Sequence, residues 1–520
     1  MPWLTILGLI PLVGAIVVWL LPGGAAGRAK QVALVFSLVT LIFGVLATVG
    51  YAGSSDPGQF RLVEQHQWIP QFGVSYALGV DGIALALILM SLILTPICLL
   101  AAWHDLPTGA AAGEQETTDR REKSYFALML VLETFMVGVF AATDVFLFYV
   151  FFEAMLIPVY FLIGQYGGPR RQYAAVKFLI FSLVGGLIML AAVIGLYTQG
   201  PGGPEGFLIE RLTGLQLDPT TGRLLFLGFF FAFAVKAPMV PVHTWLPDAA
   251  TEARPATATL LVGVLDKVGT YGMIRFCLQL FPEASQWATP VVIALAVLSV
   301  LYGALLAVGQ GDVMRLIAYT SVSHFGFIVL GIFAMTTTGF AGSTLYMVNH
   351  GFTTAALFLF AGMMVVRRGS KRIADFGGWQ RVTPLLAGSF LVAGLSGLAL
   401  PGLGAFVAEF LTLAGTFQRY PVPATLATIG IIFAALYILL MYKRMATGPV
   451  PESANGTRDL GGRERWVVAP LIALFLILGF YPKPALDLIN PAVSTTLGQM
   501  GVKDPAPIVP VSANSEGSAR

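Results

Sequence analysis

Long apolar windows recur along the whole chain, and they restrict its fold more than any other feature. A run of about 20 apolar residues crosses the hydrocarbon core of a bilayer as one helix, which satisfies its own backbone polar groups. The 520 residues are 57% hydrophobic and 11% charged, whereas soluble domains are about a quarter charged. We therefore predict an all-α polytopic membrane protein with about 14 transmembrane spans. The predicted spans are 2–22, 30–52, 79–101, 124–142, 144–166, 173–198, 223–246, 256–281, 287–308, 313–335, 343–366, 383–417, 424–446 and 466–488.

The lysines and arginines predict how these spans are oriented. Most of the 30 lie in loops that follow odd-numbered spans, among them Arg120, Arg121 and Lys123. Loops rich in Lys and Arg stay on the cytoplasmic side of a membrane. An even number of spans places both termini on one side, so both are expected to face outward. The first span lacks the basic stretch and cleavage site of a signal peptide, and we expect it to be retained.

Several classes of function lack their sequence signatures. A net charge of +3, spread over the chain, is too small to predict a nucleic-acid-binding protein. The two cysteines, Cys98 and Cys277, form no CxxC motif, and the histidines show no HxxxH or HExxH spacing. No glycine-rich dinucleotide motif, phosphate-binding loop or haem motif occurs. We therefore expect neither a metal nor a redox cofactor in this chain.

The stretch 224–255 places a charge inside an apolar span. Its first twelve residues carry no polar side chain, and Lys236 then stands close to Pro238, Pro241 and His243. A charged residue at the bilayer centre costs about 2.5–3.5 kcal/mol on insertion scales, and such residues mark ion or proton paths. Each proline removes a backbone donor and disturbs the carbonyl one turn earlier, which breaks a helix. The pattern predicts a broken helix with an ionisable group at the break.

A second break is predicted in the span 383–417. As one helix this segment would be about 50 Å long, against a hydrocarbon core of about 30 Å. The run Pro401–Gly404, of sequence Pro-Gly-Leu-Gly, is the expected break, and Glu409 follows one to two turns later. Two interrupted helices, each with an ionisable residue nearby, are typical of inverted repeats that meet at a site in the middle of the membrane.

The spacing of the ionisable residues supports such a repeat. Lys236 and Glu409 are 173 residues apart, and Glu153 and His324 are 171 apart. Five spans separate each pair, and an odd number of spans inverts the second copy. The predicted organisation is three N-terminal spans (1–123), a first repeat of spans 4–8 (124–281), a second of spans 9–13 (287–446), span 14 (466–488) and an outward-facing tail (489–520).

Glu153 and the lysines are the first candidates for a proton relay. Glu153 lies nine residues after Asp144, about 14 Å along a helix and hence near mid-depth. A Glu153–Lys236 pair that opens and closes would transfer protons, and the alternative is a static salt bridge between two helices. Lys267 follows Asp266 in the eighth span, and mid-span polar groups face the bundle interior. The alternative for Lys267 is a lysine that finds a partner locally.

Two histidines and two further carboxylates complete the candidates. His324 and His350 have an unperturbed pKa near 6.5 and are flanked by Ser, Thr or Asn able to order water; the alternative is two hydrogen-bonded core histidines. Glu133 and Asp144 could admit or release protons at the periphery, and cap or surface roles are equally open. His243 is a weaker candidate beside Lys236. Two other basic residues near span ends, Arg275 and Lys177, are predicted to extend toward the interface.

Six segments carry a family resemblance: FYVFFEAMLIPVYFLIG, FAVKAPMVPVHTWLPDAATEARPATATLL, LLVGVLDKVGTYGMIR, DVMRLIAYTSVSHFGFIVLG, MVNHGFTTAALFL and GLGAFVAEFL. They resemble the antiporter-like proton-pumping subunits of respiratory complex I and of Mrp cation/proton antiporters. The similarity spans about 75–450. Within that family, Glu409 and the absence of a long C-terminal extension resemble the M type, since L-type and N-type members mostly have lysine at that position.

The resemblance implies a role for each candidate. Glu153 would pair with Lys236 at proton entry, Lys267 would be the central switch, and Glu409 would be the exit, with His324 and His350 between them. It also implies a bacterial cytoplasmic membrane, L-type and N-type neighbours, and NADH, flavin mononucleotide, iron–sulfur clusters and quinone held by other subunits. Two alternatives remain open at this point: an Mrp-type cation/proton antiporter subunit, and a structural spacer whose buried charges only order the bundle.

Overall fold

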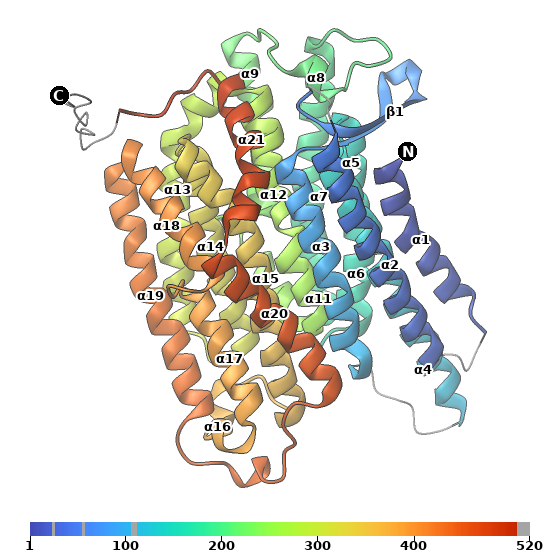
Figure 1. The fold of residues 1–520 in the computed structure, drawn as a ribbon, viewed down its shortest axis with the longest axis vertical. Helices are drawn as coiled ribbons and strands as arrows, with labels where there is room; N and C mark the ends of the chain where they lie inside the picture. Colours follow the sequence, from blue (N-terminus) through green and yellow to red (C-terminus); the bar gives the residue numbers. More distant parts are fainter. Residues whose placement is uncertain (23–25, 55–57, 106–111, 507–520) are drawn as a thin grey trace, which may run out of the picture.

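The computed structural model describes residues 1–22, 26–54, 58–105 and 112–506. It is a bundle of helices that run roughly parallel or antiparallel to one long axis (Figure 1). Within the described residues, ten helices are long and apolar enough to cross a membrane, or eleven if one bent pair counts as a span. The ten are α1 (Trp3–Leu20), α2 (Ala26–Gly53), α3 (Gly82–Ala101), α4 (Ala112–Ala141), α5 (Val145–Ala154) continued by α6 (Leu156–Tyr166), α7 (Arg171–Gln199), α13 (Pro282–Val308), α14 (Val313–Phe333), α15 (Thr337–Arg368) and α19 (Pro421–Ala446).

The other predicted spans are interrupted. Both predicted breaks occur: α9 (Pro219–Lys236) stops before α10 (Trp245–Glu252), and α17 (Pro384–Gly397) stops before α18 (Gly404–Arg419). The segment 256–281 is also irregular, because two π-helical turns, Leu261–Leu265 and Met273–Leu278, flank α12 (Lys267–Gly272) after α11 (Pro255–Leu260). These interrupted segments are not among the ten helices counted above.

The C-terminal part differs from its prediction. The expected span 466–488 ends early, because α20 (Gly462–Phe480) bends by 68° into α21 (Lys483–Gln499). Pro482 and Pro484 stand at this bend, where proline removes backbone donors. The segment 489–499, expected to belong to the tail, is therefore helical. The end of the predicted tail, 507–520, lies outside the described residues.

One end of the bundle carries a small antiparallel hairpin that the all-α prediction missed. Strand β1 (Arg61–Ile69) pairs with β2 (Val74–Val80), with His66 opposite Tyr76. We call this end the hairpin end (Figure 1). Glu64 of β1 accepts hydrogen bonds from the backbone of α1, and Gln499 of α21 bonds to Gln59 just before β1. Both ends of the described chain thus lie toward the same end of the bundle.

Helix α15 lies in the middle of the bundle and connects its two halves. It packs against α14, α17 and α18 on one side and against α3 and α11 on the other. Its most apolar window is 94% buried, as is that of α14. A lipid-facing helix would bury only one face, so α14 and α15 form the interior of the bundle. Polar side chains on them are therefore removed from both lipid and bulk water.

Side-chain hydrogen bonds hold the two helix breaks open. At the first, the indole of Trp245 donates to the Val235 carbonyl at 2.9 Å, and the Val240 amide donates to Ser299 at 3.0 Å. At the second, Asn349 of α15 donates to the carbonyl of Gly404 at 2.8 Å. Buried backbone groups must find such partners where the helical ladder stops. These bonds place the free helix ends inside the bundle.

Candidate functional site

Lys236 is the last residue of α9 and is 1% exposed. Its Nζ lies 5.4 Å from the ring centroids of both Phe152 on α5 and Phe178 on α7. Within the described part of the chain the ammonium has no hydrogen-bond partner. Aromatic faces stabilise a cation without accepting its protons. The lysine is thus held in place while its three donors stay available.

Glu153 lies on α5 beside Lys236 but does not form an ion pair with it. No Lys–Glu contact within 4.0 Å joins them among the salt bridges of the described residues, although their charges are close enough to interact. The carboxylate rests on α7, where a Cβ added to Gly186 would come within 1.7 Å of Oε1. The direct pair implied by the resemblance is therefore absent from this structure, because Gly186 lets the carboxylate pack against α7.

Asp266 connects the two lysines electrostatically. Lys267 precedes the second π-helical turn and is 0% exposed, as is Asp266. The charge of Asp266 interacts with those of both Lys236 and Lys267, and neither of its carboxylate oxygens has a hydrogen-bond partner among the described residues. π-helical turns occur often at functional sites. One buried carboxylate without a hydrogen-bond partner among the described residues thus interacts with both candidate lysines.

Lys267 makes the first contact of a polar chain that leads into the second half. Its Nζ donates to the Val262 carbonyl and lies 2.7 Å from Nδ1 of His350. A charged lysine can only donate, so beside the ammonium Nδ1 accepts the hydrogen bond and the other ring nitrogen carries the hydrogen. That nitrogen, Nε2, lies 3.0 Å from the hydroxyl of Thr354. The bond to Val262 is local, as one interpretation of Lys267 expects. The contact with His350 on α15 faces the bundle interior, as the other expects.

This series of contacting polar side chains continues from His350 to Glu409. The rings of His350 and His324 are 5.3 Å apart between centroids. Nδ1 of His324 lies 2.6 Å from the hydroxyl of Tyr346, which in turn donates to Oε2 of Glu409 at 2.7 Å. All four side chains are at least 94% buried. Apart from the gap between the two imidazoles, each step is a direct hydrogen bond.

A small cavity lies beside the two histidines. Both rings line it, together with Tyr346, Thr353 and Thr354. The volume open to a water centre is about 10 Å³, which is close to the minimum that holds one water molecule. Because both imidazoles and several hydroxyl groups line the cavity, a water there would have partners with which to connect the two rings. Gly397 and Ala405, from the two sides of the second break, close the cavity.

The three weaker candidates, Asp144, Glu133 and His243, take no part in this series of polar side chains. Asp144 caps α5, accepting from the amides of Phe146 and Leu147 and from that of Ser75, so the cap interpretation describes it. Glu133 is 0% exposed in α4, with Ser37 3.3 Å away as its partner. His243 is buried against Tyr302, with ring centroids 5.7 Å apart.

The cap role of Asp144 gives a first prediction. Replacing it with alanine removes the acceptor of three amides, two of them buried and one partly buried, so we expect the complex to lose stability by about 2 kcal/mol or more. The same change at Asp218, the exposed cap of α9, should cost about 1 kcal/mol or less. Thermal unfolding of the purified complex measures the difference. Lower proton pumping by Asp144→Ala at unchanged stability would contradict the assignment.

Two predicted interface residues are paired. Arg275 is 0% exposed and forms an ion pair with Asp81, the N-cap of α3. Lys177 pairs with Asp248 of α10 at 2.6 Å, and Arg315 of α14 binds the same carboxylate at 2.6 Å. The prediction for Arg275 was wrong, because an acidic partner distant in sequence holds it inside the bundle. Lys177 also has a partner distant in sequence, and its extension toward the interface stays a prediction. Tyr346, Thr354 and Asp248 were also missed, and only their polar side chains within apolar runs could have indicated them.

No group of three or more His, Cys, Asp or Glu residues suited to a metal ion occurs in the described ranges. Cys98 and Cys277 are free and buried. The polar chain is therefore built from groups that bind and release protons, with oxygen and nitrogen partners at hydrogen-bond distance. What it can do chemically is transfer protons or hold the two halves together.

Comparisons with known proteins agree on one family. Residues 142–436 match the family model "NADH:quinone oxidoreductase/Mrp antiporter, TM". NADH-quinone oxidoreductase subunit M of Mycobacterium tuberculosis is 50% identical, over 100% of this chain and 98% of that protein. A chain of respiratory complex I from Thermus thermophilus with bound NADH is 31% identical with a TM-score of 0.84, over 96% of this chain and 100% of that one.

The Mrp complex of Dietzia sp. contains a chain that is 23% identical with a TM-score of 0.80, over 96% of this chain and 98% of that one, a likeness of fold. The family model covers more than half of the chain, and the relatives align over nearly its whole length. The chain therefore belongs to the antiporter-like M subunits of NADH-quinone oxidoreductase, multi-pass membrane subunits of respiratory complex I that are related to Mrp antiporter subunits.

Proposed function

We propose that this subunit moves a proton across the membrane through Glu153, Lys236, Lys267, His350, His324 and Glu409, driven by NADH:quinone oxidoreduction in other subunits. The observation that carries the proposal is the buried polar chain from Lys267 to Glu409. Buried ionisable groups inside a membrane are costly, and they persist where protons or ions pass. Tyr346 is added to the relay as the bridge between His324 and Glu409.

The energies allow charge movement at Glu153 and Lys236 to gate the step. A membrane potential of 100 mV opposes each proton by about 2.3 kcal/mol. A unit charge pair at 4 Å and an effective dielectric of 20 is worth about 4 kcal/mol. Closing the pair thus releases enough energy to oppose that potential. Opening it destabilises the charge on Lys236 and favours transfer of its proton toward Lys267. In this structure the pair is open.

The finer architecture belongs to the same proposal. We propose 14 spans, with spans 4–8 (124–281) and 9–13 (287–446) as inverted repeats, 1–123 as an N-terminal unit and 466–488 as the last span. The two helix breaks and the 173-residue offset between Lys236 and Glu409 support it. Both termini would face outward from a bacterial cytoplasmic membrane. L-type and N-type subunits would lie on either side, and NADH, FMN, iron–sulfur clusters and quinone would belong to partner subunits.

The proposal is tested with Lys236→Ala, Glu153→Gln and Glu409→Gln in the assembled complex. Each is expected to lower the number of protons pumped per NADH, measured in proteoliposomes together with quinone reduction. Normal stoichiometry in all three would exclude the relay and support the spacer alternative. Sodium-dependent proton movement without NADH oxidation would instead support the antiporter alternative.

A substitution at Gly186 tests the position of Glu153 without replacing any ionisable residue. A methyl group at this position would displace the carboxylate of Glu153, which is the flexible end of its side chain. We therefore expect Gly186→Ala to assemble normally but to pump several-fold more slowly. Gly388→Ala is the control, because nothing lies within 4 Å of the added carbon there. Equal pumping by the two variants would show that the position of Glu153 is unimportant.

A further inference from the structure

Four polar residues at intervals of four lead away from the central lysine. Lys267 and Tyr271 lie on α12, Arg275 lies on the second π-helical turn, and Gln279 is the first residue after that turn. Residues four apart lie on the same face of a helix. Gln279 bonds to Gln59, just before β1, so the series runs toward the hairpin end. None of these residues except Lys267 belongs to the relay proposed above.

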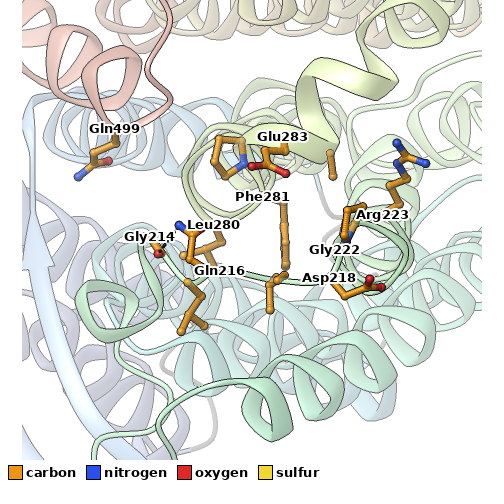
Figure 2. Close-up of a pocket in the computed structure, with 14 residues that line it drawn as sticks. Gly214, Gln216, Asp218, Gly222, Arg223, Leu280, Phe281, Glu283 and Gln499 are labelled. Carbon is orange, nitrogen blue, oxygen red and sulfur yellow. Dashed lines mark hydrogen bonds between the residues drawn. The ribbon is translucent and has the colours of Figure 1, made fainter.

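Hydrogen bonds join the outer part of this series to the surface. Gln279 is 1% exposed, and its Nε2 donates to Gln59 at 2.9 Å and to Thr213 at 3.1 Å. Gln499, which is exposed, donates to the same oxygen of Gln59 at 2.9 Å. Gln499 also lines a pocket of about 180 Å³ at the hairpin end, with Arg223 and Glu283 (Figure 2). Polar contacts therefore extend without interruption from a surface pocket to Gln279.

Arg275 stands between this polar contact chain and the central lysine. Its Nη1 donates to Gln279 at 3.1 Å and its Nε to the hydroxyl of Tyr271 at 3.4 Å, while Asp81 binds the remaining nitrogen. Its guanidinium carbon lies 4.9 Å from the centroid of Phe60 and 5.4 Å from that of Tyr271. Tyr271 donates its own proton to the Phe140 carbonyl at 2.9 Å. Every side of the guanidinium is thus occupied.

We propose that Arg275, fixed by Asp81, is a proton barrier that separates Lys267 from water at the hairpin end. A guanidinium keeps its proton at any physiological pH, so it cannot pass one on, and fixed positive groups exclude protons from membrane pores. A pump needs such a barrier, because a central lysine open to both sides at once would let protons run back. The inference rests on the proposed role of Lys267.

The test measures passive proton leak through the inhibited complex in proteoliposomes. Arg275→Gln with Asp81→Asn keeps neutral hydrogen-bonding partners but leaves space and polarity for water. We expect a several-fold higher leak and fewer protons pumped per NADH, with quinone reduction maintained. Arg223→Gln, an exposed arginine of the pocket, is the control and should leak no more than the parent. A double variant that assembles but leaks no more protons than the parent would contradict the proposal.

Adding Lys267→Met to the double variant tests the path itself. The leak should disappear, and a leak that persists would show that Arg275 does not protect Lys267. If Lys267→Met alone leaves pumping normal, the proposed relay fails rather than the barrier.

Thiol labelling gives a second readout that does not depend on removing the arginine. Thr213→Cys should react with a membrane-impermeant reagent from the hairpin side, whereas Tyr271→Cys should be protected. The two native cysteines are buried and provide a low background. Labelling of Tyr271→Cys from that side would show that water passes Arg275, which contradicts the proposal.

Discussion

Replacing Lys267 with methionine is expected to stop proton transfer through this subunit while the complex still assembles. Methionine is unbranched and adaptable, so it fills the space of the lysine stem. The substitution removes the proposed proton carrier, which contacts His350 and the Val262 carbonyl. A barrier higher by about 1.4 kcal/mol already slows a step tenfold, and loss of the carrier should exceed that. The protons pumped per NADH should fall by the full share of this subunit.

The measurement is the proton-to-electron ratio in proteoliposomes, with quinone reduction followed in the same preparation. Lys483→Met is a matched control, because that lysine is exposed and forms only an i,i+4 pair with Asp487. It should leave the ratio unchanged. If Lys267→Met also leaves the ratio unchanged, the buried chain has a purely structural role.

The second large effect is expected at Tyr346. Its hydroxyl joins Nδ1 of His324 to Oε2 of Glu409, and no other side chain of the described residues bonds to that carboxylate. Tyr346→Phe removes this one oxygen and leaves the ring in place. Each lost bond between a relay group and its neighbour costs about 1–3 kcal/mol, which slows transfer to Glu409 by one to two orders of magnitude.

Tyr437 provides the control for this experiment. Its hydroxyl also reaches His324, but at 3.4 Å and at the other ring nitrogen, Nε2. Tyr437→Phe makes the same chemical change in an equally buried residue without cutting the path to Glu409. Proton pumping should therefore drop strongly in the first variant and slightly in the second. Equal losses would indicate general disturbance of the site, and equal retention would place the path elsewhere.

The features that could be predicted from sequence depend on neighbouring residues. Proline breaks a helix through its own missing donor, so the end of α9 at Lys236 could be expected from Pro238 and Pro241. The second break followed from length alone, since a helix of 35 residues exceeds the membrane core. Glu409 could be placed beside that break because it follows Gly404 by only a few residues.

The features that could not be predicted depend on which helix faces meet. Tyr346 is one tyrosine among 16 in the chain, and only the packing of α15 against α14 and α18 brings it between His324 and Glu409. Arg275 appeared to be an interface residue because its partner Asp81 is 194 residues earlier. The open Glu153–Lys236 pair likewise depends on the contact between Gly186 on α7 and Glu153 on α5, which no local sequence pattern indicates.

Helix α15 carries contacts that restrict its own evolution. Tyr346, Asn349, His350 and Thr353 bind groups on α12, on α14 and on both sides of the second break. One residue inserted among them would turn all later positions by about 100° and shift them by 1.5 Å. Every contact beyond the insertion would be lost together. Substitutions can accumulate along this helix, but its length between Tyr346 and Thr353 should be invariant among functional relatives.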